Sequence, residues 1–241
     1  MVDESIINKV FTDVLLKCNS LTLTKINGFV NEIIDDSEIS GLISKNIYNW
    51  VKNYWSSNTE HIITYDYEEN KRIKHGKEHE VEWDEDVVEK ASKEGLLFSI
   101  HNHPNTTSFQ SGNDLDMAVI ANVKYNITIG KDGLMLIVNN NPVEERNLER
   151  LWTDNLYWQT HSSFKRWDIN NLQEFEESHL ELINNLKLEF ENGDISYQEL
   201  NDKLMKHYQK FMRDNITENI ESLEDELYAN ECNFSFYYLP V

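Results

Sequence analysis

Apolar residues in the first third of the chain change from helical to strand-like spacing. They recur every three or four positions over residues 5–18, 23–34 and 37–55, which predicts three successive helices. Residues 60–67 are instead rich in β-branched and aromatic side chains and predict a strand, and residues 72–75 follow as its hairpin partner. The N-terminal region is therefore expected to be helical, and the first sheet to begin near residue 60.

The middle of the chain continues this alternation of helices and strands. Helical patterns occupy residues 84–95 and 111–123, and strand-like runs occupy residues 96–100, 125–129 and 134–138. Alternating helices and strands are typical of proteins in which helices are layered on a sheet. We therefore expect an α/β fold, with a layered mixed sheet flanked by helices.

Long helical patterns dominate the chain from Pro142 onward. Apolar residues recur with helical spacing over residues 143–158, 171–192 and 196–228, and a strand-like segment that could join a sheet edge follows at 233–239. We expect the helices of this part either to pack on the core or to self-associate. The expected divisions are an N-terminal helical segment (1–36), an α/β core (37–140) and a helical appendage that ends in a short strand (141–241).

Composition narrows the range of partners and compartments. The chain of 241 residues has a formal net charge of −21, so we expect no nucleic-acid partner, because phosphate binding needs a basic surface. Its two cysteines, Cys18 and Cys232, are far apart in a chain without an export signal, which favours reduced thiols. No window approaches a membrane span, and we expect a soluble cytoplasmic protein.

The most informative candidate chemistry lies where the central strand gives way to a helix. His101 and His103 are separated by one residue, and after seven further residues Ser111 precedes Asp114 by three positions. Pro104 ends the strand, and we expect this break to let both imidazoles turn toward one point, with Asp114 facing back from the first helical turn. Two imidazoles and one carboxylate leave one corner of a tetrahedron open, which is the ligand count of a catalytic zinc site. The alternative is a pair of loop histidines beside a capped helix.

This spacing of His101, His103, Ser111 and Asp114 resembles the motif of the JAMM metalloproteases, also called JAB or MPN+. With Pro104 after the second histidine, it is most similar to the bacterial and phage branch, which includes RadC-like proteins. The resemblance covers about the middle two-fifths of the chain. It implies a JAB/MPN-like core, zinc bound by the two histidines and Asp114, and hydrolysis of peptide or isopeptide bonds, including those of ubiquitin-like conjugates.

A zinc hydrolase also needs a base that is not itself a ligand. In the JAMM pattern that base is a glutamate on a strand upstream of the histidines, and Glu60 fits this place best. The resemblance implies that Glu60 takes a proton from the zinc-bound water and later delivers it to the leaving amine, while Ser111 donates a hydrogen bond to the oxyanion. A helix cap is the alternative role of Ser111. The other nearby glutamates are interpreted as members of a solvated loop or strand edge: Glu68, Glu69, Glu78, Glu80 and Glu82.

The remaining histidines are not expected to form a second site. His61 follows Glu60 directly on a strand, so its side chain points to the other face. The others lie in polar surroundings or singly on helices: His75, His79, His161, His179 and His207.

Two functions remain open from the sequence. The first is a zinc-dependent metallopeptidase or isopeptidase that acts on a protein or peptide substrate. The second is a phage or mobile-element accessory protein, in which the JAB domain serves assembly and the helical C-terminal half binds a partner. A RadC-like role near DNA is a third idea, and the acidic charge argues against it.

Overall fold

The computed structural model describes residues 21–68, 70–77, 81–104, 108–109, 111–140, 155–229 and 232–241. The chain forms two compact units, one made of Met1–Leu151 with Ser235–Val241 and the other of Trp152–Phe234. The helix predicted at 5–18 and most of the one predicted at 143–158 lie outside the described residues. The C-terminal strand thus belongs almost entirely to the first unit, although the helical unit precedes it in the chain.

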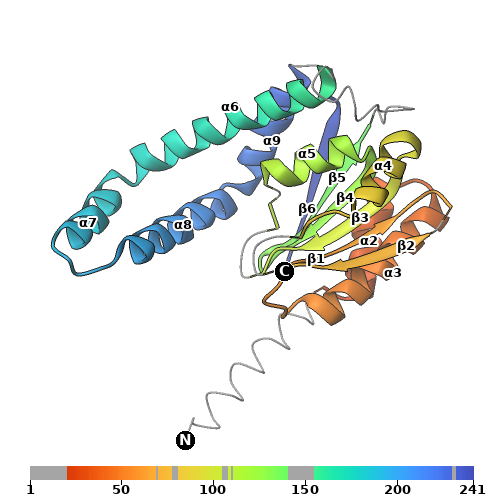
Figure 1. Ribbon diagram of the computed structural model, residues 1–241, viewed down its shortest axis with the longest axis horizontal. Helices are drawn as coiled ribbons and strands as arrows, with labels where there is room; N and C mark the ends of the chain where they lie inside the picture. Colours follow the sequence, from red (N-terminus) through yellow and green to blue (C-terminus); the bar gives the residue numbers. More distant parts are fainter. Residues whose placement is uncertain are drawn as a thin grey trace, which may run out of the picture. The chain divides into compact units, whose positions relative to one another are not determined.

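The first unit is built on a six-stranded sheet with the strand order β2-β1-β3-β4-β5-β6 (Figure 1). The predicted hairpin is present as the antiparallel pair of β1 and β2, and β1 also pairs antiparallel with β3. Strands β3 and β4 pair parallel, whereas β4 and β5 pair antiparallel. The prediction of an α/β fold with a mixed sheet is therefore confirmed. The strands are β1 (His61–Tyr65), β2 (Lys71–His75), β3 (Leu96–Asn102), β4 (Val123–Ile129), β5 (Gly133–Asn139) and β6 (Phe234–Pro240).

Side-chain alternation along β3 determines which residues enter the main core. Phe98 and Ile100 belong to a buried cluster that includes Ile47 of α3, and Phe98 stacks on Tyr65 of β1 with ring centroids 4.5 Å apart. Because successive side chains of a strand point to opposite faces, His101 lies on the face away from this stack. The helices of this unit are α2 (Leu23–Ile33), α3 (Ser37–Tyr54), α4 (Glu85–Glu94) and α5 (Gly112–Ile120).

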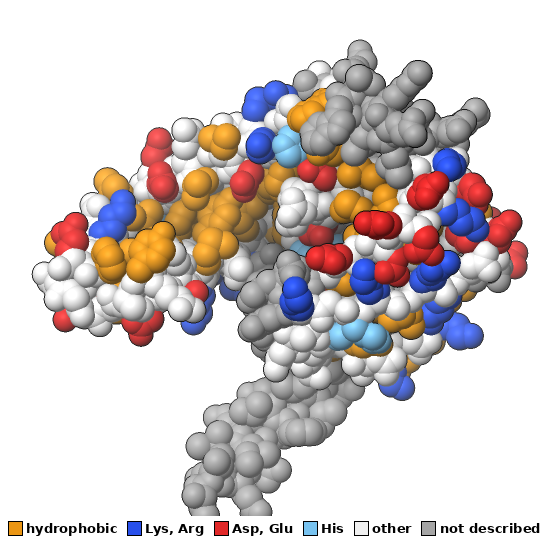
Figure 2. Space-filling model, in the orientation of Figure 1, with side chains coloured by type: hydrophobic (Ala, Val, Ile, Leu, Met, Phe, Trp, Pro, Cys, Tyr) orange, Lys and Arg blue, Asp and Glu red, His pale blue; other side chains and the backbone are white. Residues whose placement is uncertain are grey.

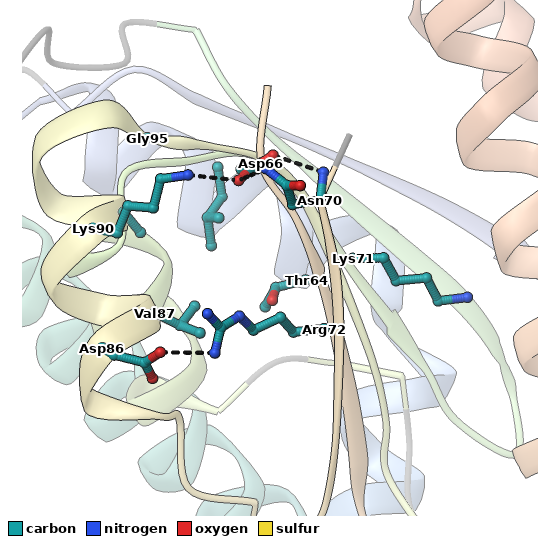
Figure 3. A pocket seen from close by; sticks show the side chains of 11 residues that line it. Thr64, Asp66, Asn70, Lys71, Arg72, Asp86, Val87, Lys90 and Gly95 are labelled. Carbon is teal, nitrogen blue, oxygen red and sulfur yellow. Dashed lines mark hydrogen bonds and ion pairs between the residues drawn. The ribbon is translucent and has the colours of Figure 1, made fainter. Parts of the chain in front are cut away.

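Helix α4 is attached to the sheet by apolar side chains and by ion pairs, two of which lie beside a cavity. Lys90 binds Asp66 at 3.0 Å and Arg72 binds Asp86 at 2.7 Å, on either side of a cavity of about 280 Å³ (Figure 3). Exposed pairs of this kind contribute roughly 0.2–1 kcal/mol each, so the apolar contacts dominate. Those contacts join α4 and α5 to the starts of β3 and β4 through a cluster of Ala91, Leu96, Ala118, Ala121 and Val123.

The second unit consists of four described helices, whose buried apolar side chains pack against one another. Trp167 of α6 is buried and its indole Nε1 donates to the carbonyl of Asn219 in α9, 3.1 Å away. Phe175 of α6 packs on Phe211 of α8 with centroids 5.7 Å apart. The helices are α6 (Asn155–Ser178), α7 (Leu180–Glu191), α8 (Tyr197–Asp214) and α9 (Ile216–Tyr228).

The sequence pattern does not show where these helices break. The single helix predicted over 196–228 is two helices, separated at Asn215, whose side-chain amide donates to the carbonyl of Phe211 at 2.9 Å. The helix predicted over 171–192 is likewise divided at His179, and its first part continues α6. Apolar spacing runs on through both positions, so periodicity alone predicts a continuous helix.

The search for membrane spans found no candidate among the helices of the described residues, since none combines the length and the apolar character that a bilayer crossing needs.

Gly133 permits the close approach of β6 to the β4–β5 turn. A Cβ atom at this position would overlap the carbonyl oxygen of Leu239 in β6. Tyr238 of β6 donates its hydroxyl to the carbonyl of Asp132 at 2.8 Å, and Val241 N–H donates to the same carbonyl at 3.1 Å. The glycine therefore matters for the pairing of the last strand.

We expect Gly133→Ala to lower the free energy of unfolding by about 1–3 kcal/mol, because the added methyl group must push β6 away. Gly41→Ala is the matched control: Gly41 lies within α3 with nothing near its Cβ position, so alanine there should stabilise by up to about 1 kcal/mol. Urea denaturation followed by circular dichroism measures both. Equal stability of Gly133→Ala and the wild-type chain would contradict the packing argument.

Candidate metal centre

Three side chains converge where β3 ends and α5 begins. His101 is the last residue but one of β3, His103 directly follows the strand, and Asp114 is in the first turn of α5. The two Nε2 atoms are 3.1 Å apart. Asp114 Oδ1 lies 3.4 Å from His101 Nε2, and Oδ2 lies 3.3 Å from His103 Nε2. One ligand atom from each residue thus lies within 4.8 Å of the others, as a shared ion requires.

The convergence of the histidines does not depend on a break in the strand, and that expectation was wrong. Residues two apart on a strand share a face, so His101 and His103 point the same way in regular extended backbone. The N–H of His103 donates to the carbonyl of Ile129 at 2.9 Å and so continues the hydrogen bonding of β3 with β4. Strand periodicity aligns the two imidazoles, and α5 brings the carboxylate to them.

Asp114 is held in place by a reciprocal cap at the start of α5. Its Oδ2 accepts from the N–H and the hydroxyl of Ser111, both at 2.7 Å, and its own N–H donates back to the Ser111 hydroxyl at 3.3 Å. This is the capping box that satisfies two otherwise unpaired donors at a helix start. The helix-cap role of Ser111 is therefore present in the structure, and the same bonds orient a metal ligand.

The charge state of Asp114 suits ligation. Burial by itself raises the pKa of this carboxyl, but the positive charge available on His101 and the hydrogen bonds from both imidazoles outweigh it and hold the pKa well below its usual range. The carboxylate is therefore ionised at neutral pH. Metal binding needs that form, because a ligand must give up its proton first.

The donor set fits a zinc ion. At zinc–ligand bonds of about 2.0–2.1 Å, tetrahedral geometry separates neighbouring ligand atoms by about 3.3 Å. The two Nε2 atoms are 3.1 Å apart, while the contacts of 3.4 Å to His101 and 3.3 Å to His103 come from different carboxylate oxygens, Oδ1 and Oδ2. One ligand atom of each residue lies within 4.8 Å of the others, so the three residues could share an ion. The side chain of His101 is 4% exposed and that of Asp114 is 24% exposed, so the carboxylate is the more accessible of these two groups.

Glu60 lies directly before β1, the strand that pairs with β3. Ile62 pairs with His101 in the β1–β3 register, and Glu60 precedes Ile62 by two residues just as His103 follows His101 by two. Residues two apart share a face, so Glu60 lies on the face of Ile62 and His101. Its backbone is bonded to the two residues that follow β2. The N–H of Glu60 donates to the carbonyl of Lys77 at 2.7 Å, and its carbonyl accepts from the N–H of Gly76.

Asn102 ties the backbone around Glu60 to the strand of the histidines. It is 3% exposed, and its side-chain oxygen accepts from the N–H of His61 at 2.9 Å. Its side-chain nitrogen donates to the carbonyl of Thr59 at 3.0 Å. One amide therefore holds the residues on both sides of Glu60, and the residue between the two histidines has a structural use that the sequence did not reveal.

The rival glutamates are less well placed where the structure describes them. Glu68 lies in the exposed β1–β2 turn, where its carboxylate accepts from Asn70 at 3.2 Å. Glu82 is exposed before α4. The other three, Glu69, Glu78 and Glu80, lie outside the described residues.

The structure brings together two histidines that the sequence analysis treated separately. His61 and His75 are directly opposite in the β1–β2 register, and their Nδ1 atoms are 2.8 Å apart. The hairpin was predicted, so counting outward from its turn could have paired them. By contrast, His161 stacks on Tyr157 and His179 on Phe175 in the helical unit. His79 lies outside the described residues.

Comparison of the chain with known protein families, with curated proteins and with solved structures found no match.

We expect Ser111→Ala to weaken zinc binding about 10–100-fold, because a partner that orients a metal ligand is lost. It should also cost about 1 kcal/mol of stability in the metal-free chain, as the loss of a helix cap does. Ser196→Ala is the matched control, since Ser196 forms the same capping box with Glu199 at the start of α8. Chelator competition and thermal unfolding measure the two effects. Unchanged zinc affinity in Ser111→Ala would contradict the orienting role.

Proposed function

We propose that the chain is a metal-dependent hydrolase that cleaves peptide or isopeptide bonds with zinc held by His101, His103 and Asp114. The observation that carries the proposal is the convergence of these three side chains at hydrogen-bonding distances. An N,N,O donor set with an open corner is typical of catalytic zinc. The resemblance of the motif to JAMM metalloproteases supports the bond type, and ubiquitin-like conjugates are one substrate class that it suggests.

The other residues around the centre have separate proposed roles. Bound zinc would supply Lewis acidity and lower the pKa of water toward about 7. Glu60 is the proposed base, which accepts a proton on the ligand face of the sheet and returns it to the leaving amine. The strand register supports this role, because Glu60 and His103 each lie two residues beyond the Ile62–His101 pair. Asn102 keeps this geometry by holding the backbone of Thr59 and His61.

Ser111 is the proposed oxyanion donor, but its hydroxyl is already in use. The hydrogen is directed at Asp114 Oδ2, 2.7 Å away, and the oxygen accepts from Asp114 N–H. To donate to substrate, the hydroxyl must turn away from the carboxylate. The orienting and donating roles therefore compete for a single hydrogen.

A second candidate function is an accessory role in a phage or mobile element, in which the helical unit binds a partner. It is favoured by apolar side chains that remain exposed on that unit, such as Ile169 (54%), Leu180 (60%) and Leu188 (54%). Figure 2 shows hydrophobic side chains gathered along the helices of this unit. Variants of the metal ligands separate the two functions, because they should abolish hydrolysis and leave partner binding intact.

We expect the wild-type chain to hold about one zinc ion, and His103→Ala and Asp114→Ala to lose it, because two ligands cannot retain what three hold. Glu60→Gln should keep the zinc and lose at least about 10²-fold in turnover, as removal of a general base does. Glu82→Gln is the matched control, an exposed glutamate near α4 that should leave turnover unchanged.

Metal content by plasma mass spectrometry and cleavage of quenched peptide and isopeptide-linked substrates test these expectations. The proposal fails if the ligand variants retain zinc at wild-type affinity, or if Glu60→Gln turns over as fast as the wild type.

We expect Asn102→Ala to lower kcat more than it raises KM, because the backbone on both sides of Glu60 loses its hydrogen bonds to the Asn102 side chain. Zinc content should stay at the wild-type level, because Asn102 is not a proposed ligand. The substitution leaves the His61 N–H and the Thr59 carbonyl without their partner, which costs about 1–3 kcal/mol of stability. Asn171→Ala in the helical unit, where another buried amide is lost, controls for a general loss of stability. Wild-type kcat in Asn102→Ala would show that Glu60 needs no such support.

A further inference from the structure

A second cluster of metal-binding side chains lies at the open end of the β1–β2 hairpin. His61 and His75 face each other across the strands with Nδ1 atoms 2.8 Å apart and rings at 81°. Tyr54 of α3 packs on both rings, with centroids 4.5 Å from His61 and 6.1 Å from His75. Ile62 pairs with His101, so His61, one residue earlier on β1, points to the opposite face of the sheet from His101. This pair is therefore separate from the candidate zinc centre.

The surroundings of His61 are compatible with the tautomer that a metal ligand needs. Its Nε2 lies 2.9 Å from the hydroxyl of Ser57 and 3.1 Å from that of Thr59. When the Ser57 hydroxyl donates to the carbonyl of Thr59, it accepts from the imidazole, and the ring carries its hydrogen on Nε2. The lone pair is then on Nδ1 and points at His75. A hydrogen bond from the far nitrogen is the usual means of orienting a histidine ligand.

The two rings differ in exposure. His61 is 8% exposed, whereas His75 is exposed on the edge strand, so the ring of His75 has room to turn slightly and admit an ion.

The chemistry of the two ligand atoms indicates which ions suit the pair. The 2.8 Å separation is a hydrogen-bond distance, and it shows that the two Nδ1 atoms face each other. Imidazole nitrogens suit copper, nickel and zinc ions, and among these divalent ions Cu²⁺ binds nitrogen ligands most tightly. The pair contains no carboxylate, unlike the cluster around Asp114.

We propose that His61 and His75 form a second metal site, which binds one Cu²⁺ ion, or Ni²⁺ more weakly, with water in the remaining positions. The ion replaces the hydrogen shared by the two Nδ1 atoms. That hydrogen leaves to solvent as a proton, and the same ring takes up a proton from solvent on its Nε2. Each imidazole then binds the ion as a neutral ligand with its hydrogen on Nε2, and no net proton is released. No electron transfer is involved. The proposal does not depend on the hydrolase function.

The test uses the untagged full-length chain titrated with Cu²⁺ and followed by calorimetry and electron paramagnetic resonance. His75→Gln should bind one Cu²⁺ equivalent fewer than the wild type and should lose the splitting from two nitrogen ligands. His207→Gln, which removes a histidine from α8, should behave as the wild type. Because His75 is exposed, its variant should unfold at the wild-type temperature without metal.

Equal Cu²⁺ stoichiometry in His75→Gln and the wild type would overturn the proposal, as would the same loss in His207→Gln. His103→Ala keeps the two questions apart. It should retain the equivalent that His75→Gln loses, whether or not the proposed hydrolase centre binds an ion.

Discussion

The candidate centre depends on a single carboxylate that serves two structural purposes. Asp114 caps α5 through Ser111, and it is also the group that faces both imidazoles. The two carboxylate oxygens of Asp114 thus link the start of α5 to the two histidines at the end of β3. Because the carboxylate is ionised and already surrounded by donors, its position is set before any ion arrives. Such preorganisation reduces the conformational cost of binding.

The last residues of β3 serve both faces of the sheet in alternation. His101 and His103 point to the face of the candidate centre, and Asn102 between them reaches the backbone before β1. Every residue of this short run therefore has a defined contact. Ile62 of β1 pairs with His101, so Glu60, two residues earlier, is expected on the face of the candidate centre and His61 on the opposite face. Each of these two neighbouring residues therefore belongs to a different proposed site.

Local patterns in the sequence were sufficient to predict the strands, most helices of the first unit and the ligand cluster. Strand alternation and helix capping act over a few residues, so the spacing from His101 to Asp114 already contains the geometry of the centre. The meeting of His61 with His75 required the hairpin register, which depends on counting from the turn. At the break at Asn215, the side-chain amides of Asn215 and Asn219 donate to the carbonyls of Phe211 and Met212, and apolar spacing does not reveal these contacts. The function of Asn102 likewise depends on a contact with residues about forty positions earlier.

The order of the strands makes the first unit discontinuous in the chain. Strand β5 ends at Asn139 and its neighbour β6 begins at Phe234, so the whole helical unit is inserted between two adjacent strands. β5 is buried along its entire length, and without β6 one of its edges would present unpaired backbone groups. In a chain shortened after β5, this strand would become an apolar edge strand with unpaired backbone groups, and we expect such a chain to aggregate. To isolate the first unit, the helical insertion must be replaced by a short linker that leaves the C-terminal strand attached.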